Sequence, residues 1–145
     1  MKIGIGSDHG GYELKMFIRE YLEEKAIEVV DYGTHSTESV DYPEYGQKVA
    51  EAVVKQEVEL GIIVCGTGLG ISMAANKVKG IRAAVVSEEF SARMAKAHNN
   101  ANILALGGRV VGKDLAKSIV DAFLETPFEG GRHQRLIDKM MMIEQ

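Results

Sequence analysis

A single cysteine stands where an apolar run of residues meets a series of glycines. The stretch VELGIIVCGTGLGISMAANK, residues 58–77, places Cys65 just before Gly66, Gly68 and Gly70. These glycines let backbone N–H groups approach a ligand closely, and the start of a following helix favours negative charge. The same amides and helix dipole stabilise a thiolate. The stretch could hold an oxyanion beside a base, although a buried cysteine in a tight turn fits equally well.

The glycine loop differs from other anion-binding loops. Its spacing is not G-x-G-x-x-G, and it lacks the Lys followed by Ser or Thr of a P-loop, so nucleotide binding is disfavoured. A cysteine phosphatase would have an arginine six residues after the thiol, where this chain has Ile71. An acid–base or oxyanion role is therefore favoured over these alternatives.

Other polar segments carry candidate acids and phosphate ligands. In GSDHGG, Asp8 could orient the His9 imidazole or a substrate hydroxyl, or the two could be a solvated loop pair. His98 ends a predicted helix, whose C-terminus favours the protonated imidazole of a general acid, although a plain helix cap is as consistent. Arg109 and the basic residues of EGGRHQR, 129–135, could bind phosphate, or the latter could be a solvated basic segment. No pair of histidines or carboxylates has metal-ligand spacing, so we expect no metal and no cofactor.

The composition favours one compact domain spanning residues 1–145. The chain is 46% hydrophobic and carries a net charge of −4, which argues against nucleic-acid or membrane-surface binding. The N-terminus does not resemble a signal peptide, and no 18 apolar residues follow one another. With one cysteine and therefore no internal disulfide, we expect a cytoplasmic protein.

Short apolar runs alternate with amphipathic stretches along the whole chain. Five strands are predicted, at residues 3–5, 27–30, 61–64, 82–86 and 103–106. Helices are predicted around 14–22, 44–55, 71–77, 88–97 and 115–123, with polar breaks at 33–46 and 125–135 and a final helix after the second. This alternation predicts an α/β fold with helices on both faces of a parallel sheet. If the strand order begins 2-1-3, the loops GSDHGG and VCGTGLG meet at the point where that order reverses, which is where such sheets bind ligands.

The chain resembles the B-type ribose-5-phosphate isomerases, within the larger group that includes galactose-6-phosphate isomerase subunits. The resemblance is carried by GSDHGGYELK at 6–15, VDYPEYG at 40–46, CGTGLGISMAANK at 65–77, GIRAAV at 80–85, AHNNANILALGGRVVG at 97–112 and EGGRHQ at 129–134. It implies a Rossmann-like three-layer α/β/α fold with a five-stranded parallel sheet. It also implies metal-free interconversion of ribose 5-phosphate and ribulose 5-phosphate, and a homodimer whose sites draw on both subunits; a tetramer stays open.

The resemblance also implies residue roles. Cys65 would be the base that moves a proton between C1 and C2, and His98 the acid that opens the furanose ring, assisted by Thr67. The amides from Gly66 to Gly70 would hold the cis-enediolate. The implied substrate contacts are Asp8, His9, Tyr42, Gly66, Gly68, Leu69, Gly70, Asn99, Arg109 and Arg132.

One position departs from the family pattern. The family usually has a further phosphate-binding arginine four residues after Arg132, where this chain has Leu136. Arg135 is adjacent, but one residue along a helix is a rotation of about 100°, so it need not face the same phosphate. A branch of the family uses a glutamate base further along the cysteine loop; GISMAA here contains no acid, which leaves Cys65 as the base.

Two other functions are compatible with the same residues. An isomerase of six-carbon sugar phosphates, such as allose or galactose 6-phosphate, would differ mainly in pocket length. A non-catalytic sugar-phosphate sensor could use the same fold, because fold alone does not fix function. A sensor would need the glycine loop without the base, so the joint presence of Cys65, Thr67 and His98 favours an enzyme.

Overall fold

Five parallel strands form one sheet in the order β2-β1-β3-β5-β4. A computed structural model describes residues 1–145. The strands are β1 (Lys2–Ser7), β2 (Glu28–Asp31), β3 (Leu60–Cys65), β4 (Ala83–Val85) and β5 (Ile103–Gly107). All five lie on the predicted apolar runs, and the α/β class is confirmed.

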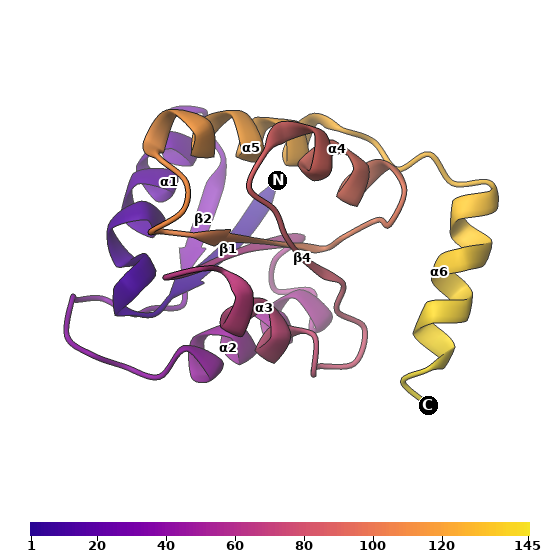
Figure 1. Ribbon diagram of the computed structural model, residues 1–145, viewed down its shortest axis with the longest axis horizontal. Coiled ribbons are helices and arrows are strands. Elements are labelled where there is room, and N and C mark those ends of the chain that lie inside the picture. Colours follow the sequence, from indigo (N-terminus) through magenta and orange to yellow (C-terminus); the bar gives the residue numbers. More distant parts are fainter.

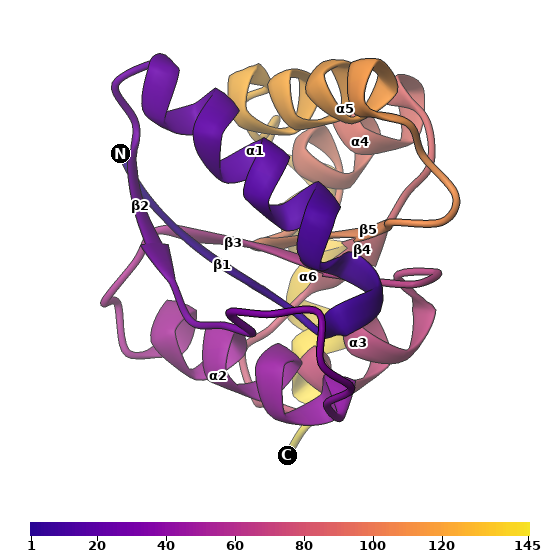
Figure 2. The ribbon, with the colours of Figure 1, turned by 90° about the vertical axis from the view of Figure 1, so that its left-hand side faces the viewer.

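Helices cover both faces of the sheet. The helices are α1 (Tyr12–Glu24), α2 (Tyr42–Val54), α3 (Leu69–Ala75), α4 (Glu89–Ala97), α5 (Lys113–Glu125) and α6 (Arg132–Met142), and a 3-10 turn spans His9–Gly11. Figure 2 shows α1, α4 and α5 on one face and α2 and α3 on the other, while α6 stands to one side in Figure 1. No helix is both long and apolar enough to cross a membrane.

Two helices begin inside segments that the sequence pattern predicts as breaks. Helix α2 starts at Tyr42, because Pro43 supplies a fixed φ suited to a first helical turn. Helix α6 starts at Arg132, directly after Gly130 and Gly131, which both have positive φ. The basic residues of EGGRHQR therefore lie largely on a helix, where their side chains are spaced around its axis.

The sheet separates two apolar clusters. Ile3, Ile5 and Leu104 face the side of α1, α4 and α5, where Phe123 is fully buried. Ile63, Ile103 and Ala105 pack on the other side with residues of α2 and α3. The central strands are buried on both faces, as expected for a parallel sheet covered by helices. This burial makes the carboxyl ends of β1, β3 and β5 a rigid base for the loops that follow them.

A buried ion pair anchors the loop between β2 and α2. The Lys15 ammonium donates to the Asp31 carboxylate at 2.8 Å and to the carbonyl oxygen of Thr34. The side chains of Lys15 and Asp31 are only 1% and 5% exposed. Burial lowers the pKa of Lys15, and its hydrogen bond to Asp31 offsets part of that effect. The pair holds the start of the 33–41 loop against the end of β1, where the Ser7 amide donates to the Gly33 carbonyl and the Thr34 amide donates to the Ser7 carbonyl.

We predict that Lys15→Met destabilises the fold by about 3–5 kcal/mol, because it removes the buried cation of Asp31 and leaves only the partly exposed Arg19, 3.3 Å away. The matched control is Lys2→Met, whose partner Glu28 lies 3.5 Å away and is 66% exposed. That exposed pair should contribute less than about 1 kcal/mol. Urea denaturation of both variants measures the difference, and equal small losses would contradict the anchoring role of Lys15.

Candidate active site

Cys65 is the last residue of β3 and lies at the point where the strand order reverses. It pairs in register with Gly107 of β5, and its side chain is 5% exposed. The Gly68 amide donates a hydrogen bond to the Cys65 sulfur at 3.1 Å. A hydrogen bond from an amide stabilises negative charge on the sulfur. The thiol is therefore a buried group whose charged form has a preformed partner.

The loop after Cys65 has the shape of an anion nest. Gly68 has a φ of 81°, in the left-handed region, and a Cβ there would lie 2.8 Å from the Leu106 carbonyl carbon. This conformation turns the Gly68 amide back toward the sulfur and starts α3 at Leu69. The exposed Thr67 hydroxyl accepts from the Leu69 amide at 3.2 Å. Hydroxyl, thiol and amides thus occur within one short turn.

Main-chain hydrogen bonds join the loops that follow β1, β3 and β5. The Asp8 amide donates to the Val64 carbonyl at 3.3 Å, and the Gly108 amide donates to the Cys65 carbonyl at 2.8 Å. The Arg109 amide donates to the Gly66 carbonyl at 3.0 Å. The strand order and these contacts confirm that the two glycine-rich loops meet, and they add the Arg109 loop to them.

Asp8 and His9 are both fixed by the main chain. The Asp8 carboxylate is largely buried and accepts from the Gly11 amide at 3.1 Å. The Nδ1 atom of His9 accepts from the Val40 amide at 3.1 Å. A ring that accepts at Nδ1 carries its proton on Nε2, so His9 presents a donor to whatever lies beyond it.

Tyr42 and Arg109 pack against the glycine loop from two other segments. A Cβ on Gly70 would lie 2.6 Å from the Tyr42 Cζ atom, and one on Gly66 would lie 3.0 Å from the Arg109 Nη1 atom. The absence of side chains at these glycines is what allows the phenol ring and the guanidinium to come so close. The predicted pocket aromatic and one predicted phosphate ligand therefore do adjoin the Cys65 loop.

His98, Asn99 and Arg132 lie at the other edge of the sheet. His98 caps the C-terminus of α4 and precedes the first residue of β5, Ile103, whereas Cys65 pairs with the last residue, Gly107. The strand alone separates those ends by about 13 Å. One chain therefore does not bring the predicted acid to the predicted base.

His98 lies against His133, which the sequence places in a basic segment that could bind phosphate, and Glu129, to which the sequence assigns no role. The His98 and His133 rings are stacked with centroids 4.1 Å apart, and the Glu129 carboxylate lies within 4 Å of both Nε2 atoms. The three residues also place their ligand atoms within 4.8 Å of one another. The spacing of Glu129 and His133 was a local signal, but their contact with His98 depends on how α6 docks.

The arginines of α6 are free of ion pairs. Arg132 and Arg135 are exposed and form no salt bridge, and Leu136 is 46% exposed on the same helix. Leu136, which departs from the family pattern, therefore lies on the surface of α6 near Arg132 and is not part of the core.

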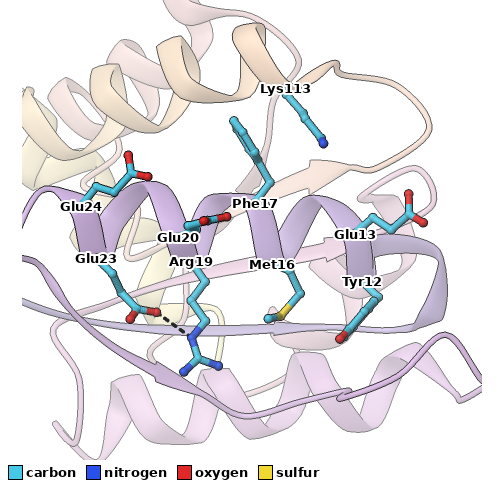
Figure 3. Close-up of a pocket in the computed structure, with 9 residues that line it drawn as sticks. All are labelled: Tyr12, Glu13, Met16, Phe17, Arg19, Glu20, Glu23, Glu24 and Lys113. Atoms are coloured by element: carbon cyan, nitrogen blue, oxygen red, sulfur yellow. Dashed lines mark hydrogen bonds and ion pairs between the residues drawn. The ribbon is translucent and has the colours of Figure 1, made fainter.

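A separate groove runs along the outer side of α1 (Figure 3). It has a volume of about 1030 Å³ and includes none of the residues of the cysteine loop. Glu13, Glu20, Glu23 and Glu24 line it against the cations Arg19 and Lys113, and Arg19 is paired with Glu23. This excess of carboxylates makes the groove unsuited to an anionic sugar phosphate.

The sequence matches the family model described as Ribose/Galactose Isomerase over residues 3–140. It is 54% identical over 144 residues to ribose-5-phosphate isomerase B of Escherichia coli K12, covering 99% of this chain and 97% of that protein. The structure matches that of Clostridium thermocellum ribose-5-phosphate isomerase B with a TM-score of 0.99 and 61% identity, covering 99% and 97% of the two chains. A crystal structure of the Mycoplasma genitalium ribose-5-phosphate isomerase B with bound ribulose-5-phosphate matches with a TM-score of 0.95 and 48% identity, covering 99% and 95%.

We predict that Gly68→Ala destabilises the protein by about 2 kcal/mol or more, because it combines a left-handed φ with a clash against the Leu106 backbone. Gly112→Ala is the control, since a Cβ there meets nothing within 4 Å and its φ is −80°. Denaturant titration compares the two variants. A Gly68→Ala variant as stable as the control would show that the turn does not need its left-handed residue.

Proposed function

The chain belongs to the ribose/galactose isomerase family, and on that premise we propose that it interconverts D-ribose 5-phosphate and D-ribulose 5-phosphate by proton transfer at Cys65. It is an aldose–ketose isomerase, as are the relatives named above. The observation that carries the proposal is the buried Cys65 sulfur, held by the Gly68 amide where the strand order reverses. A non-catalytic sensor would need the anion-binding amides but would not need a thiol placed to act as a base.

Cys65 acts as the base in the proton transfer. Its thiolate removes the proton from C2 of the open-chain aldose, and the same proton or one from solvent returns to C1 of the ketose. Between the two steps a cis-enediolate forms, and a hydroxyl proton moves from O2 to O1. We place this oxyanion against the backbone amides of the Gly66 to Gly70 loop, of which Gly68 and Leu69 already donate to Cys65 and Thr67. Each free donor can lower the barrier by about 3 kcal/mol.

His98 acts as the acid that opens the furanose ring by protonating the ring oxygen, with Thr67 assisting. Asp8, His9, Tyr42 and Asn99 contact the sugar. The Nε2–H of His9 is directed by the Val40 bond, which supports its role as a donor to a substrate oxygen. Metal and cofactor are not needed for this chemistry, because thiolate, amides and imidazole supply base, oxyanion donors and acid.

Arg109 and Arg132 bind the phosphate. Both are exposed, and guanidinium groups match phosphate oxygens in pairs. Leu136 leaves the usual third arginine position without a cation, so the two arginines bear most of the phosphate charge. Arg135, one position earlier on α6, and Lys139, three positions later, are the neighbouring cations that could compensate.

A second copy of the chain completes the site. Within one chain the acid and the base lie at opposite edges of the sheet, so we place His98, Asn99 and Arg132 of one subunit against the Cys65 loop of another. Exposed apolar side chains around that loop support the contact: Leu69, Met73, Val85 and Val110 are each at least 38% exposed. Such a surface is typical of a subunit interface, and a homodimer is the simplest assembly.

We treat residues 1–145 as one sugar-phosphate isomerase domain and place its activity in the cytoplasm. The free thiol of Cys65 supports a reducing compartment.

Two variants should distinguish the role of Cys65 as base from the role of His98 as ring-opening acid. Ribulose 5-phosphate cannot close a furanose ring, because its C5 oxygen carries the phosphate. His98→Asn should therefore lower conversion of ribose 5-phosphate about 100-fold while preserving exchange of the C1 proton of ribulose 5-phosphate in D₂O. Cys65→Ala should lower both by at least about 100-fold and leave sugar-phosphate binding largely intact.

Proton NMR follows the exchange, a coupled assay follows conversion, and calorimetry measures binding. A Cys65→Ala variant whose activity stays within about tenfold of wild type would rule out the thiol as base. Equal losses of exchange and conversion in His98→Asn would rule out a role confined to ring opening.

Mixed assemblies should test whether sites are shared. Each dimer of a Cys65→Ala subunit and a His98→Asn subunit has one site with both lesions and one with neither. Refolding the two inactive variants together should restore about a quarter of the wild-type activity, because half of the random dimers are mixed. Each variant refolded alone is the control, and no recovery in the mixture would place both residues in one subunit's site.

A further inference from the structure

Two imidazole rings from different parts of the chain are stacked at the end of α4. The His98 and His133 ring centroids lie 4.1 Å apart, and the ring planes differ by 10°. His98 is the C-cap of α4, and His133 is the second residue of α6. The His133 side chain is only 12% exposed, and its ring covers one face of the His98 ring.

Glu129 faces both rings. Its carboxylate oxygens lie 3.8 Å from His98 Nε2 and 3.5 Å from His133 Nε2. The Glu129 amide donates to the carbonyl of Ala97 at 3.0 Å, which fixes this segment to the end of α4. The carboxylate therefore has a defined place next to the imidazole that opens the ring.

Glu129 is the carboxylate that faces this stack. The neighbouring cations are directed elsewhere: Arg82 donates to the Asn99 and Asn100 carbonyls, and Arg132, which precedes His133, is exposed. The Glu129 carboxylate, close to both Nε2 atoms, is therefore the group that can orient the His98 ring.

The same geometry is poor for a chelated metal ion. The lone pair of an imidazole nitrogen lies in the plane of its ring, and planes that are nearly parallel and 4.1 Å apart do not converge on one point. The stack therefore fits two rings that orient each other better than it fits a metal centre.

We infer that His133 and Glu129 are positioning residues for His98. The His133 ring fixes the plane of the His98 imidazole, and the Glu129 carboxylate, 3.8 Å from His98 Nε2, orients that ring for donation to the sugar ring oxygen. This inference rests on the proposed role of His98. It adds two residues whose effect is exerted through His98 and is confined to ring opening.

Three variants and one control test the inference. Glu129→Gln and His133→Ala should each lower conversion of ribose 5-phosphate about tenfold, a part of what a general acid contributes. Both should leave C1 proton exchange of ribulose 5-phosphate close to wild type. His133→Phe keeps a stacked ring and should recover most of the conversion rate lost in His133→Ala. Glu125→Gln, an exposed acid four residues before Glu129, should change neither rate.

A second readout does not depend on activity. The ring current of the neighbour shifts the His98 Hε1 resonance, so His133→Ala should move that resonance toward its unstacked position. His133→Phe should keep it displaced in the same direction as in the wild type, and Glu125→Gln should leave it unmoved. An unmoved resonance in His133→Ala would overturn the inference even if His98 had another role. Unchanged conversion in Glu129→Gln and His133→Ala, or exchange and conversion falling together, would overturn it as well.

Discussion

The hydrogen bond from the Gly68 amide to the Cys65 sulfur connects the chemistry of this protein to its fold. It requires a left-handed residue at position 68, and only glycine fits there, because a Cβ would lie within 3.0 Å of the Leu106 backbone and the Val85 side chain. Leu106 is in place because β5 pairs with β3, and β3 is central in the sheet. The buried Cys65 sulfur is thus held by contacts that extend into the central strands.

The sheet also divides the proposed chemistry into two halves. The carboxyl edge carries the thiol, the amide nest, Asp8 and His9, while the region beyond the amino end of β5 carries His98 and, on α6, Arg132. Separation of this kind follows from connectivity, because a helix that returns to a parallel sheet ends at the amino edge of the next strand. In the proposed dimer, unlike ends of the two sheets would meet without a change in the path of either chain.

The extent to which the sequence predicted the structure depended on whether a feature was local. The apolar runs located all five strands, and the loop after Cys65 could be identified because thiol and glycines are adjacent in sequence. The start of α6 was misplaced because Gly130 and Gly131 read as a break, although they serve as the lead-in to a helix. Glu129 was missed because its relation to His98 exists only once α6 has docked beside α4.

The interpretation of Cys65, Thr67 and His98 as parts of one site came from resemblance to the family. Their spacing places Cys65 and Thr67 in one turn, but it does not say where His98 lies relative to them. The strand order does contain that information, since His98 precedes β5 and Cys65 ends β3. Chain order and parallel topology together would have predicted the separation.

The contact between Tyr42 and Gly70 has a consequence for how substrates are sorted. With no Cβ on Gly70, the phenol ring rests on the main chain of the glycine loop. If this loop holds the enediolate as proposed, the width of the pocket at the reacting carbons is limited by main chain, which does not change rotamer. Discrimination between sugars of different length would then be left to the exposed side chains of the two proposed phosphate arginines.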